Sequence, residues 1–421
     1  MKVLIAATAC SPFIGSEAYV GWEAVSSLRH DNDLWVMTSL WCREAIDKVV
    51  ENEDGWDRVH FVYVDEDQDN KPCPENRMLA RLQSWLSYRH WCRKAVSVAR
   101  ELHREIDFDL AHHITYATWR MGSPLAGVGI PWIWGPIGGG ERFPFELIQI
   151  LSPTAIVFEI FRTFSTCFYR ITKKVKCSLR DASVIIASNE ETACFLSSIS
   201  PLREKPVILS QAFLTPSRID SLRRTSRDAP LEHGLIEIVS GGNLEGRKGV
   251  AISVKALQLV RLAGIPFRYR HFGDGPESKH LLQLVSKMCL SEHVEFLPPL
   301  HGMNYVQMLK SAHFYLLPSL RESAGLSLME AMAAGCVPIV ADGGGPASIV
   351  ANAGIKPIPI RCVTDMAEEI AARLTTYWSD SAAWNDSSKK SSNAISSEHS
   401  SARYAHRIYA IYENCLGGGE G

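Results

Sequence analysis

Short apolar runs alternate with longer amphipathic stretches along most of the chain. In the first half the runs predict strands at Val3–Ala7, Leu34–Thr38, His60–Val64, Leu110–His112, Trp132–Trp134 and Val184–Ala187. A second series predicts strands at Ile236–Val239, Tyr269–Phe272, Val294–Leu297, Phe314–Leu317 and Val337–Ala341. Strands that alternate with helical segments are typical of βα units and parallel sheets. We therefore expect an α/β protein with two doubly wound sheets.

A polar segment bracketed by prolines separates the two series. Residues 215–231 have the composition of a linker, so we expect an N-terminal domain over 1–214 and a C-terminal domain over 232–392. Ser379–Ser401 is rich in Ser, Asn, Asp and Lys and is expected to be an exposed loop. After it, Arg403–Leu416 regains an amphipathic pattern that predicts a final helix.

Composition narrows the class of protein. The 421 residues are 46% hydrophobic and 21% charged, as in folded globular proteins. The 44 basic and 46 acidic residues give a net charge of −2, so nucleic acid is not an expected partner. Eleven cysteines without a Cys-x-x-Cys pair favour free thiols, and no secretory signal is recognised, so we expect a cytoplasmic protein and no metal site.

Residues 155–180 form an aromatic segment that becomes basic toward its end. Four phenylalanines at helical spacing come first, and five Lys or Arg residues follow. We favour a long helix buried against the first sheet with a solvated basic end. The alternative is an interfacial helix that makes peripheral contact with the inner face of a membrane.

Two glutamates separated by seven residues, Glu322 and Glu330, follow the predicted strand Phe314–Leu317. Glu322 falls in the loop at the carboxyl end of the strand, and Glu330 falls in a helix that Gly335 is expected to end. Ligands of open α/β sheets bind at that end of the strands, where the next helix offers unpaired N–H groups to a pyrophosphate. Ionised carboxylates accept hydrogen bonds, which suits sugar and ribose hydroxyls. The alternative for Glu330 is an exposed helix glutamate.

A basic, glycine-rich loop follows the predicted strand Ile236–Val239. Its Arg247 and Lys248 stand at the entry of a helix, where cationic groups would face phosphate oxygens. A glycine turn with an exposed basic pair is an equally good interpretation. The turn Gly273-Asp274-Gly275-Pro276 follows the next strand and allows close approach of a ligand.

Three places in the first half are candidates for ligand contact. Gly15-Ser16-Glu17 leaves the first strand and enters a helix, as either a cleft-facing turn or a plain N-cap. His112 and His113 end a strand and point to opposite sides of it, so we expect one of them to face the ligand. The segment from Gly135 to Glu141 either lies under an acceptor or simply turns the chain.

In order and spacing, these motifs together resemble the retaining glycosyltransferases of family 4, the glycosyl transferases group 1. The resemblance covers nearly the whole chain and is best from Glu322 to Gly335 and at Gly343-Gly344-Gly345-Pro346. It implies the GT-B architecture, two Rossmann-like domains facing a central cleft, with the last helix (402–416) returning to the first domain. It also implies a nucleotide sugar as co-substrate, retention of anomeric configuration, and neither a cofactor nor a required metal.

The resemblance also implies roles for individual residues. Lys248 would contact the donor pyrophosphate with Arg247 beside it, Glu322 would bind hydroxyls of the donor sugar, and His113, or else His112, would lie by that sugar. The implied donor-binding positions are Gly15, Ser16, Gly242, Asn243, Gly273, Gly275, Ser323, Gly325, Leu326 and Glu330, with N–H groups from Gly325 and Leu326 and ribose contact from Glu330. The acceptor-side candidates are Glu17, His112, Gly138, Gly139 and Glu141.

Two positions depart from the family pattern, and one of them is Ala324, where an aromatic residue is common after Glu322-Ser323. Asn243 stands where the family usually has an arginine, five residues before Lys248, and Arg247 is the candidate to supply the missing charge. We expect transfer of a sugar to a glycan, a lipid-linked acceptor or a small molecule, in polysaccharide or glycoconjugate biosynthesis. The alternatives are a GT-B epimerase or phosphorylase, or a non-catalytic sugar-binding protein.

Overall fold

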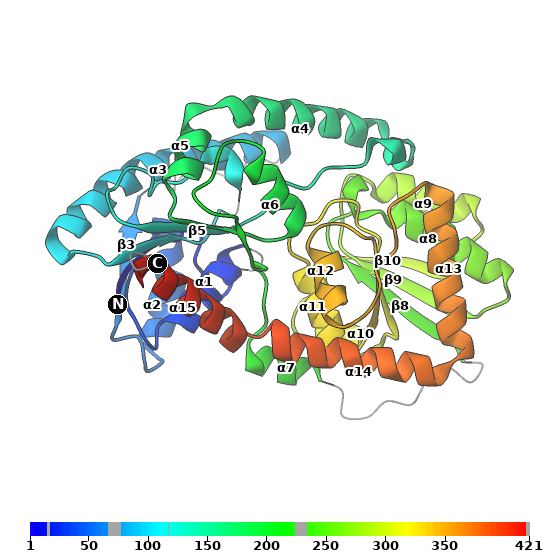
Figure 1. Ribbon diagram of the computed structural model, residues 1–421. Helices are drawn as coiled ribbons and strands as arrows, with labels where there is room; N and C mark the ends of the chain where they lie inside the picture. Colours follow the sequence, from blue (N-terminus) through cyan, green and yellow to red (C-terminus); the bar gives the residue numbers. More distant parts are fainter. Residues whose placement is uncertain (15–16, 66–76, 117, 224–233, 418–421) are drawn as a thin grey trace. The chain divides into compact units, whose positions relative to one another are not determined.

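The computed structural model describes residues 1–14, 17–65, 77–116, 118–223 and 234–417, without the side chains of 77–82. The chain forms two compact units (Figure 1). The first comprises residues 1–140, 166–211 and 401–421, and the second comprises residues 141–165 and 212–400.

The first unit is built on a parallel sheet. Its described strands are β1 (Lys2–Ala6), β2 (Asp33–Ser39), β3 (Val59–Val64), β4 (Leu110–His113), β5 (Trp132–Ile137), β6 (Val184–Ala187) and β7 (Val207–Ile208), in the order β3-β2-β1-β4-β5-β6-β7. Its helices are α1 (Glu17–Leu28), α2 (Arg43–Val50), α3 (Arg77–Ile106), α5 (Lys173–Asp181), α6 (Glu190–Ser197) and α15 (Ser401–Gly417). The six predicted strands are confirmed, while the two-residue β7 is too short to give an apolar run.

The second unit repeats this arrangement on a smaller sheet. Its described strands are β8 (Ile236–Gly241), β9 (Phe267–Phe272), β10 (Val294–Leu297), β11 (Phe314–Leu317) and β12 (Val337–Val340), in the order β10-β9-β8-β11-β12. Its helices are α7 (Pro216–Leu222), α8 (Val250–Leu262), α9 (Ser278–Lys287), α10 (Gly302–Ser311), α11 (Leu326–Ala333), α12 (Gly344–Asn352), α13 (Val363–Ser379) and α14 (Ser381–Glu398).

Alternate residues of the second sheet enter two different cores. On β11, Phe314 and Leu316 join one buried cluster with residues of α8 and α13, whereas Tyr315 and Leu317 join another with residues of α10 and α11. Burial on both faces makes such strands nearly continuous apolar runs, which is why the sequence pattern located them. The expected α/β class with two Rossmann-like sheets is confirmed.

Three expectations about segments need correction. Residues 216–222 of the expected linker form α7, which buries Ile219 and Leu222 in the second unit, and residues 224–231 lie outside the described part. Ser379–Ser401 is not a loop, because most of it forms α14. Residues 141–165 belong to the second unit rather than to an N-terminal domain.

The aromatic segment also differs from the favoured expectation. It forms α4 (Pro153–Ile171), whose first residues belong to the second unit and whose last belong to the first. Glu159 is its buried residue, and the phenylalanines Phe158, Phe161, Phe164 and Phe168 are exposed. The expectation that this helix is buried through its aromatic face is therefore wrong.

Candidate functional site

The carboxyl ends of β8 and β11 lie side by side in the second sheet, because these strands pair in parallel. Chain order reverses between them, since β9 and β10 continue on one side of β8 while β12 lies beyond β11. Such a reversal is where open α/β sheets bind ligands. The loops that follow β8 and β11 therefore form the candidate site.

Backbone contacts hold these two loops together. The N–H of Leu320 donates to the carbonyl oxygen of Arg247 at 2.8 Å. Gly249 has φ +68°, and an added Cβ there would overlap the carbonyl oxygen of Pro318. Only glycine meets both conditions without strain. The loop after β8 is thus fixed against the loop after β11.

Three charged side chains meet between the loops. Lys248 Nζ donates to Glu322 Oε2, and Arg247 Nη1 donates to the same oxygen at 3.0 Å. Arg247 Nε also donates to Glu245 Oε2 at 2.7 Å. The side chains of Lys248 and Glu322 are only 11% and 16% exposed, so their charges are weakly screened. Arg247 therefore faces the glutamate and not the solvent.

The electrostatics of the cluster keep Glu322 ionised. Burial disfavours its charged form, but the ammonium of Lys248 and the guanidinium of Arg247 outweigh burial and lower its pKa. Burial works against the charge of Arg247 as well, yet Glu322 and Glu245 raise its pKa. At neutral pH the cluster holds a carboxylate acceptor beside two cations.

The start of α11 lies directly after this cluster. Gly325, with φ +94°, is the N-cap residue, and Leu326 opens the helix, so the first N–H groups lack partners within it. In the same loop Ser323 Oγ donates to Glu141 Oε2 at 2.9 Å. Glu141 is buried and belongs to the second unit rather than to the expected N-terminal domain, and its acceptor-side role stays a prediction.

Glu330 lies one turn into α11 and is held on both carboxylate oxygens. Arg218 of α7 donates to Oε1 from Nε at 2.8 Å and from Nη2 at 2.6 Å, and Tyr305 of α10 donates to Oε2 at 2.6 Å. The alternative of an exposed helix glutamate is therefore wrong. The expected ribose contact stays a prediction, and Oε2, which accepts from Tyr305, retains a second lone pair for it.

Two glycines after β9 allow close approach to the loop after β8. Gly273 has φ +137°, and an added Cβ would overlap the carbonyl oxygen of Gly242. An added Cβ on Gly275 would likewise overlap the carbonyl oxygen of Leu244. These two glycines thus let the β9 turn pack against the β8 loop, where Asn243 is exposed.

His271 is a buried residue beside the loop after β8 that the sequence motifs did not single out. Its Nε2 lies 2.9 Å from the carbonyl oxygen of Gly242, and its Nδ1 lies 2.6 Å from Ser240 Oγ. Burial lowers its pKa to about 4, so the neutral ring donates to Gly242 and accepts from Ser240. The alternation of Phe267, Tyr269 and His271 on one face of β9 was the signal that could have located it.

The two histidines of β4 both lie inside the first unit. His112 Nε2 is 2.8 Å from the carbonyl oxygen of Gly135 and its Nδ1 is 2.7 Å from Tyr412 Oη of α15. His113 stacks on Trp134 and its Nε2 is 3.5 Å from Tyr88 Oη. Burial lowers the pKa of His112 to about 4 and that of His113 to about 3. They point to opposite sides as expected, and neither side chain reaches the surface.

The other N-terminal candidates are spread over the first unit. Glu17 opens α1, whereas Gly15 and Ser16 lie outside the described residues. Gly138 pairs with Thr118 in an isolated bridge, and the carbonyl oxygen of Gly139 accepts from Trp119 Nε1 at 3.0 Å. Within the first unit, these contacts give the two glycines a structural role.

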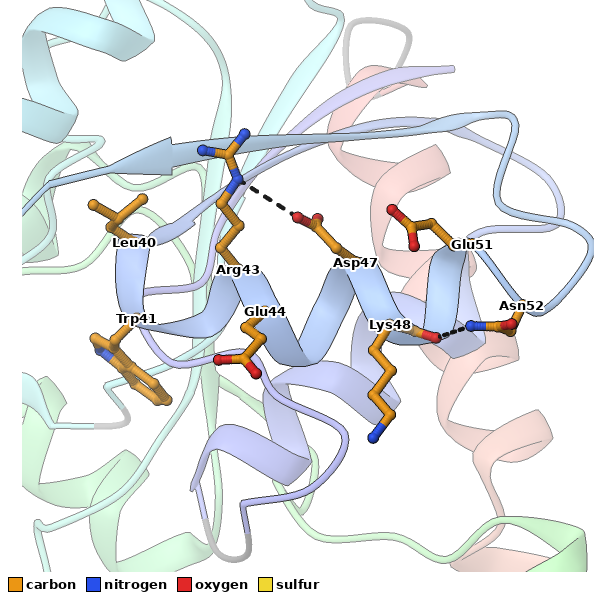
Figure 2. Close-up of a pocket in the computed structure, with 8 residues that line it drawn as sticks. All are labelled: Leu40, Trp41, Arg43, Glu44, Asp47, Lys48, Glu51 and Asn52. Carbon is orange, nitrogen blue, oxygen red and sulfur yellow. Dashed lines mark hydrogen bonds and ion pairs between the residues drawn. The ribbon is translucent and has the colours of Figure 1, made fainter.

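A surface hollow on the first unit lies along α2 (Figure 2). Its walls include Arg43 and Asp47, an exposed ion pair with 3.5 Å between Nε and Oδ2. None of the predicted site residues lines it. The charge cluster at β8 and β11 remains the candidate site.

Comparison with known families identifies the same region. Residues 223–396 match the family model described as Glycosyl transferases group 1. This match includes β8 to β12 and every residue of the Lys248, Arg247 and Glu322 cluster.

A curated relative also carries a glycosyltransferase name. The colanic acid biosynthesis glycosyltransferase WcaL of Salmonella typhimurium is 30% identical over 169 residues, which are 38% of this chain and 40% of the relative. The alignment thus spans about two fifths of that relative's length.

Solved structures resemble nearly the whole chain. Anabaena Alr3699/HepE in complex with UDP has a TM-score of 0.64 and 16% identity, with 98% of this chain and 100% of that chain covered. Sucrose-phosphate synthase from Thermosynechococcus elongatus has a TM-score of 0.66 and 16% identity, with 99% and 100% covered. At this identity the likeness shows the fold, two Rossmann-like domains of the GT-B class.

Proposed function

We propose that the protein is a retaining glycosyltransferase that moves a sugar from a nucleotide-sugar donor to a glycan, a lipid-linked acceptor or a small molecule. The match of residues 223–396 to the group 1 glycosyl transferases supports this activity. The relative named for colanic acid biosynthesis supports a role in polysaccharide or glycoconjugate biosynthesis. The cysteine pattern favours a cytoplasmic location for this activity.

One observation carries the proposal: Lys248 and Arg247 meet Glu322 at the sheet position where chain order reverses. A nucleotide sugar presents a diphosphate next to a polyhydroxylated ring. Two cations and the N-terminus of α11 complement the diphosphate, and an ionised carboxylate complements the ring hydroxyls. An ammonium has three donors, so Lys248 can hold Glu322 and phosphate oxygens together.

The same groups fit the chemistry of the transfer. When the bond between the anomeric carbon and the phosphate oxygen breaks, negative charge develops on the departing diphosphate. Lys248 and Arg247 would stabilise that charge. Such electrostatic stabilisation by preorganised groups is usually the largest single contribution to an enzyme's rate enhancement. The acceptor oxygen would attack the anomeric carbon from the same face, and its proton would pass to the departing phosphate oxygen.

In this reaction the two glutamates would bind the donor. Ionised Glu322 would accept hydrogen bonds from the donor sugar, and Glu330 would contact the ribose through the second lone pair of Oε2. The two cations would take the place of a metal ion, so we expect no metal requirement. UDP-sugars are the first donors to examine, because Anabaena HepE has been solved with UDP and with UDP-glucose.

The test begins with ligand-observed NMR on a panel of nucleoside-diphosphate sugars, with and without EDTA. One donor should bind, and EDTA should leave binding unchanged. Slow hydrolysis of that donor should first give a sugar of the same anomeric configuration, observed by proton NMR before mutarotation. Inverted product would contradict retention, and loss of binding with EDTA would contradict metal independence.

The same panel separates the competing functions. A sugar-binding protein would hold the donor intact, and an epimerase would convert it into another nucleotide sugar without releasing diphosphate. A phosphorylase would require inorganic phosphate. Binding of no donor would contradict the whole proposal.

A further inference from the structure

Helix α4 presents a continuous apolar stripe to solvent. Val157, Phe161, Phe164 and Phe168 recur at intervals of three or four residues, which places them on one face of a helix. The phenylalanines at 161, 164 and 168 are 66%, 71% and 61% exposed. Ile160 and Ile171 extend the same face and are also exposed.

The opposite side of the helix is fixed within the second unit. Glu159 is buried there and pairs with Arg321 Nη1. This ion pair sets which face of α4 turns inward. The phenylalanine stripe is therefore the face that remains outside.

Charge identifies the kind of surface that complements the stripe. Between residues 160 and 180 the chain has no Asp or Glu, and its basic residues are Arg162, Arg170, Lys173, Lys174, Lys176 and Arg180. Lys173, Lys174 and Arg180 are exposed on α5, which begins two residues after α4 ends. In a chain with net charge −2, this is a local concentration of positive charge.

Insertion across a bilayer does not fit this segment. Among the described helices, each one is too short or too polar to span a membrane. A Phe-rich face followed by Lys and Arg fits a helix that lies in the plane of an anionic lipid surface, with its rings among the acyl chains and its cations at the headgroups.

We propose that α4 and α5 dock the protein on the surface of an anionic phospholipid bilayer. The stripe supplies apolar area and the α5 cations supply attraction to lipid phosphates. This inference goes beyond the proposed function, since it concerns where the protein works and not which donor it uses.

The experiment is vesicle co-flotation of the full chain without any nucleotide sugar. Vesicles of phosphatidylcholine alone are compared with vesicles in which about a third of the lipid is phosphatidylglycerol. The protein should float with the anionic vesicles and remain unbound with neutral ones, and added salt should weaken binding because it screens the cations.

Two variants separate the apolar and electrostatic contributions. Phe161→Ser/Phe164→Ser removes exposed rings, and Lys173→Glu/Lys174→Glu reverses exposed charges. Each should weaken vesicle binding about tenfold or more. The matched controls are Leu262→Ser, another strongly exposed apolar residue, and Lys279→Glu/Lys287→Glu on α9, which should bind like the wild type.

Light scattering and circular dichroism complete the test. Unchanged spectra would show that the variants fold, as expected for substitutions of exposed side chains. Absence of flotation, or flotation unaffected by both α4 and α5 variants, would overturn the proposal. A dimer that Phe161→Ser/Phe164→Ser converts to monomer, without vesicle binding, would assign the stripe to a second copy of the chain. Because no sugar transfer is measured, failure here leaves the donor-site proposal untouched.

Discussion

The cations beside Glu322 come from consecutive residues and reach the same carboxylate oxygen. The short 3-10 turn Gly246–Lys248 makes this convergence possible before α8 begins. Glycine spacing and a helix entry are local features, so the sequence was sufficient to place Lys248 in the loop before α8, while its role at a donor site stays a prediction. The direction of Arg247 depends on Glu245 and Glu322, and a basic pair in a turn has no periodicity that reveals it.

Arg247 gives the first prediction. Arg247→Ala should lower donor turnover about 10- to 100-fold, because a charge-assisted contact to the phosphate is worth roughly 1.5–3 kcal/mol. Adding Asn243→Arg should restore part of the activity, since it places a cation at the position usual for the resembled family. Steady-state kinetics with the identified donor measure both effects. Unchanged turnover in Arg247→Ala would contradict a contact between this arginine and the phosphate, and would leave it only a structural role in pairing with Glu245.

His112 gives a prediction about pH. Its pKa is about 4 in the folded protein, whereas the ordinary value is 6.5. Between these two pH values the imidazole is protonated in the unfolded chain and neutral in the folded chain. Stability from this residue is therefore complete above pH 6.5 and declines as the pH falls toward 4, by up to about 2 kcal/mol over the first 1.5 units. The thermal unfolding temperature of His112→Gln should fall less steeply with decreasing pH than that of the wild type. Parallel curves for wild type and variant would contradict the neutral buried histidine.

Among the elements, α14 shows where an apolar pattern is insufficient. Its buried positions follow helical spacing, but two of the five are serines: Trp384, Ser388, Ser391, Ala394 and Ile395. Ser388 Oγ donates to the carbonyl oxygen of Gly335 at 2.6 Å, so tertiary contacts satisfy its hydroxyl. A serine-rich helix packed closely within the second unit can therefore have the composition of a loop. In α15 the buried face carries Tyr404, Ile408 and Tyr412, and the apolar pattern predicted that helix.

Trp384 distinguishes a packed α14 from a loop. Its side chain is fully buried, so Trp384→Ala should lower the free energy of unfolding by about 3–5 kcal/mol. Lys389→Ala, at an exposed position of the same helix, should change it by less than about 0.5 kcal/mol. Thermal or urea unfolding of both variants makes the comparison. Equal stability of the two variants would contradict the burial of Trp384.

At the scale of the whole molecule, parallel strands were predictable because burial on both faces leaves an imprint in the sequence. The assignment of residues 141–165 to the second unit was not. It depends on contacts between residues far apart in the chain: Ser323 with Glu141, Arg321 with Glu159, and the N–H of Ser152 with Glu277. Long-range pairs of polar groups have no local signature, so sequence continuity suggested the wrong unit.

The Arg321 and Glu159 pair tests this assignment. Both side chains are buried, so Glu159→Met alone should destabilise the protein by about 3–5 kcal/mol through an unpaired guanidinium. Glu159→Met/Arg321→Met should recover most of that loss, because a buried ion pair can be replaced by apolar side chains with little net change. Thermal unfolding of the single and double variants measures the coupling. Additive losses would show that the two residues do not interact.

The most direct measurement of the central claim is the rate at which the protein releases nucleoside diphosphate from its identified donor, compared for Lys248→Ala, Glu322→Gln and the exposed control Lys279→Ala. Lys248→Ala and Glu322→Gln should each release it at least about 100-fold more slowly than wild type. Both should remain folded by circular dichroism, and the control should match wild type. Wild-type rates in folded Lys248→Ala and Glu322→Gln would contradict a donor site built on this cluster.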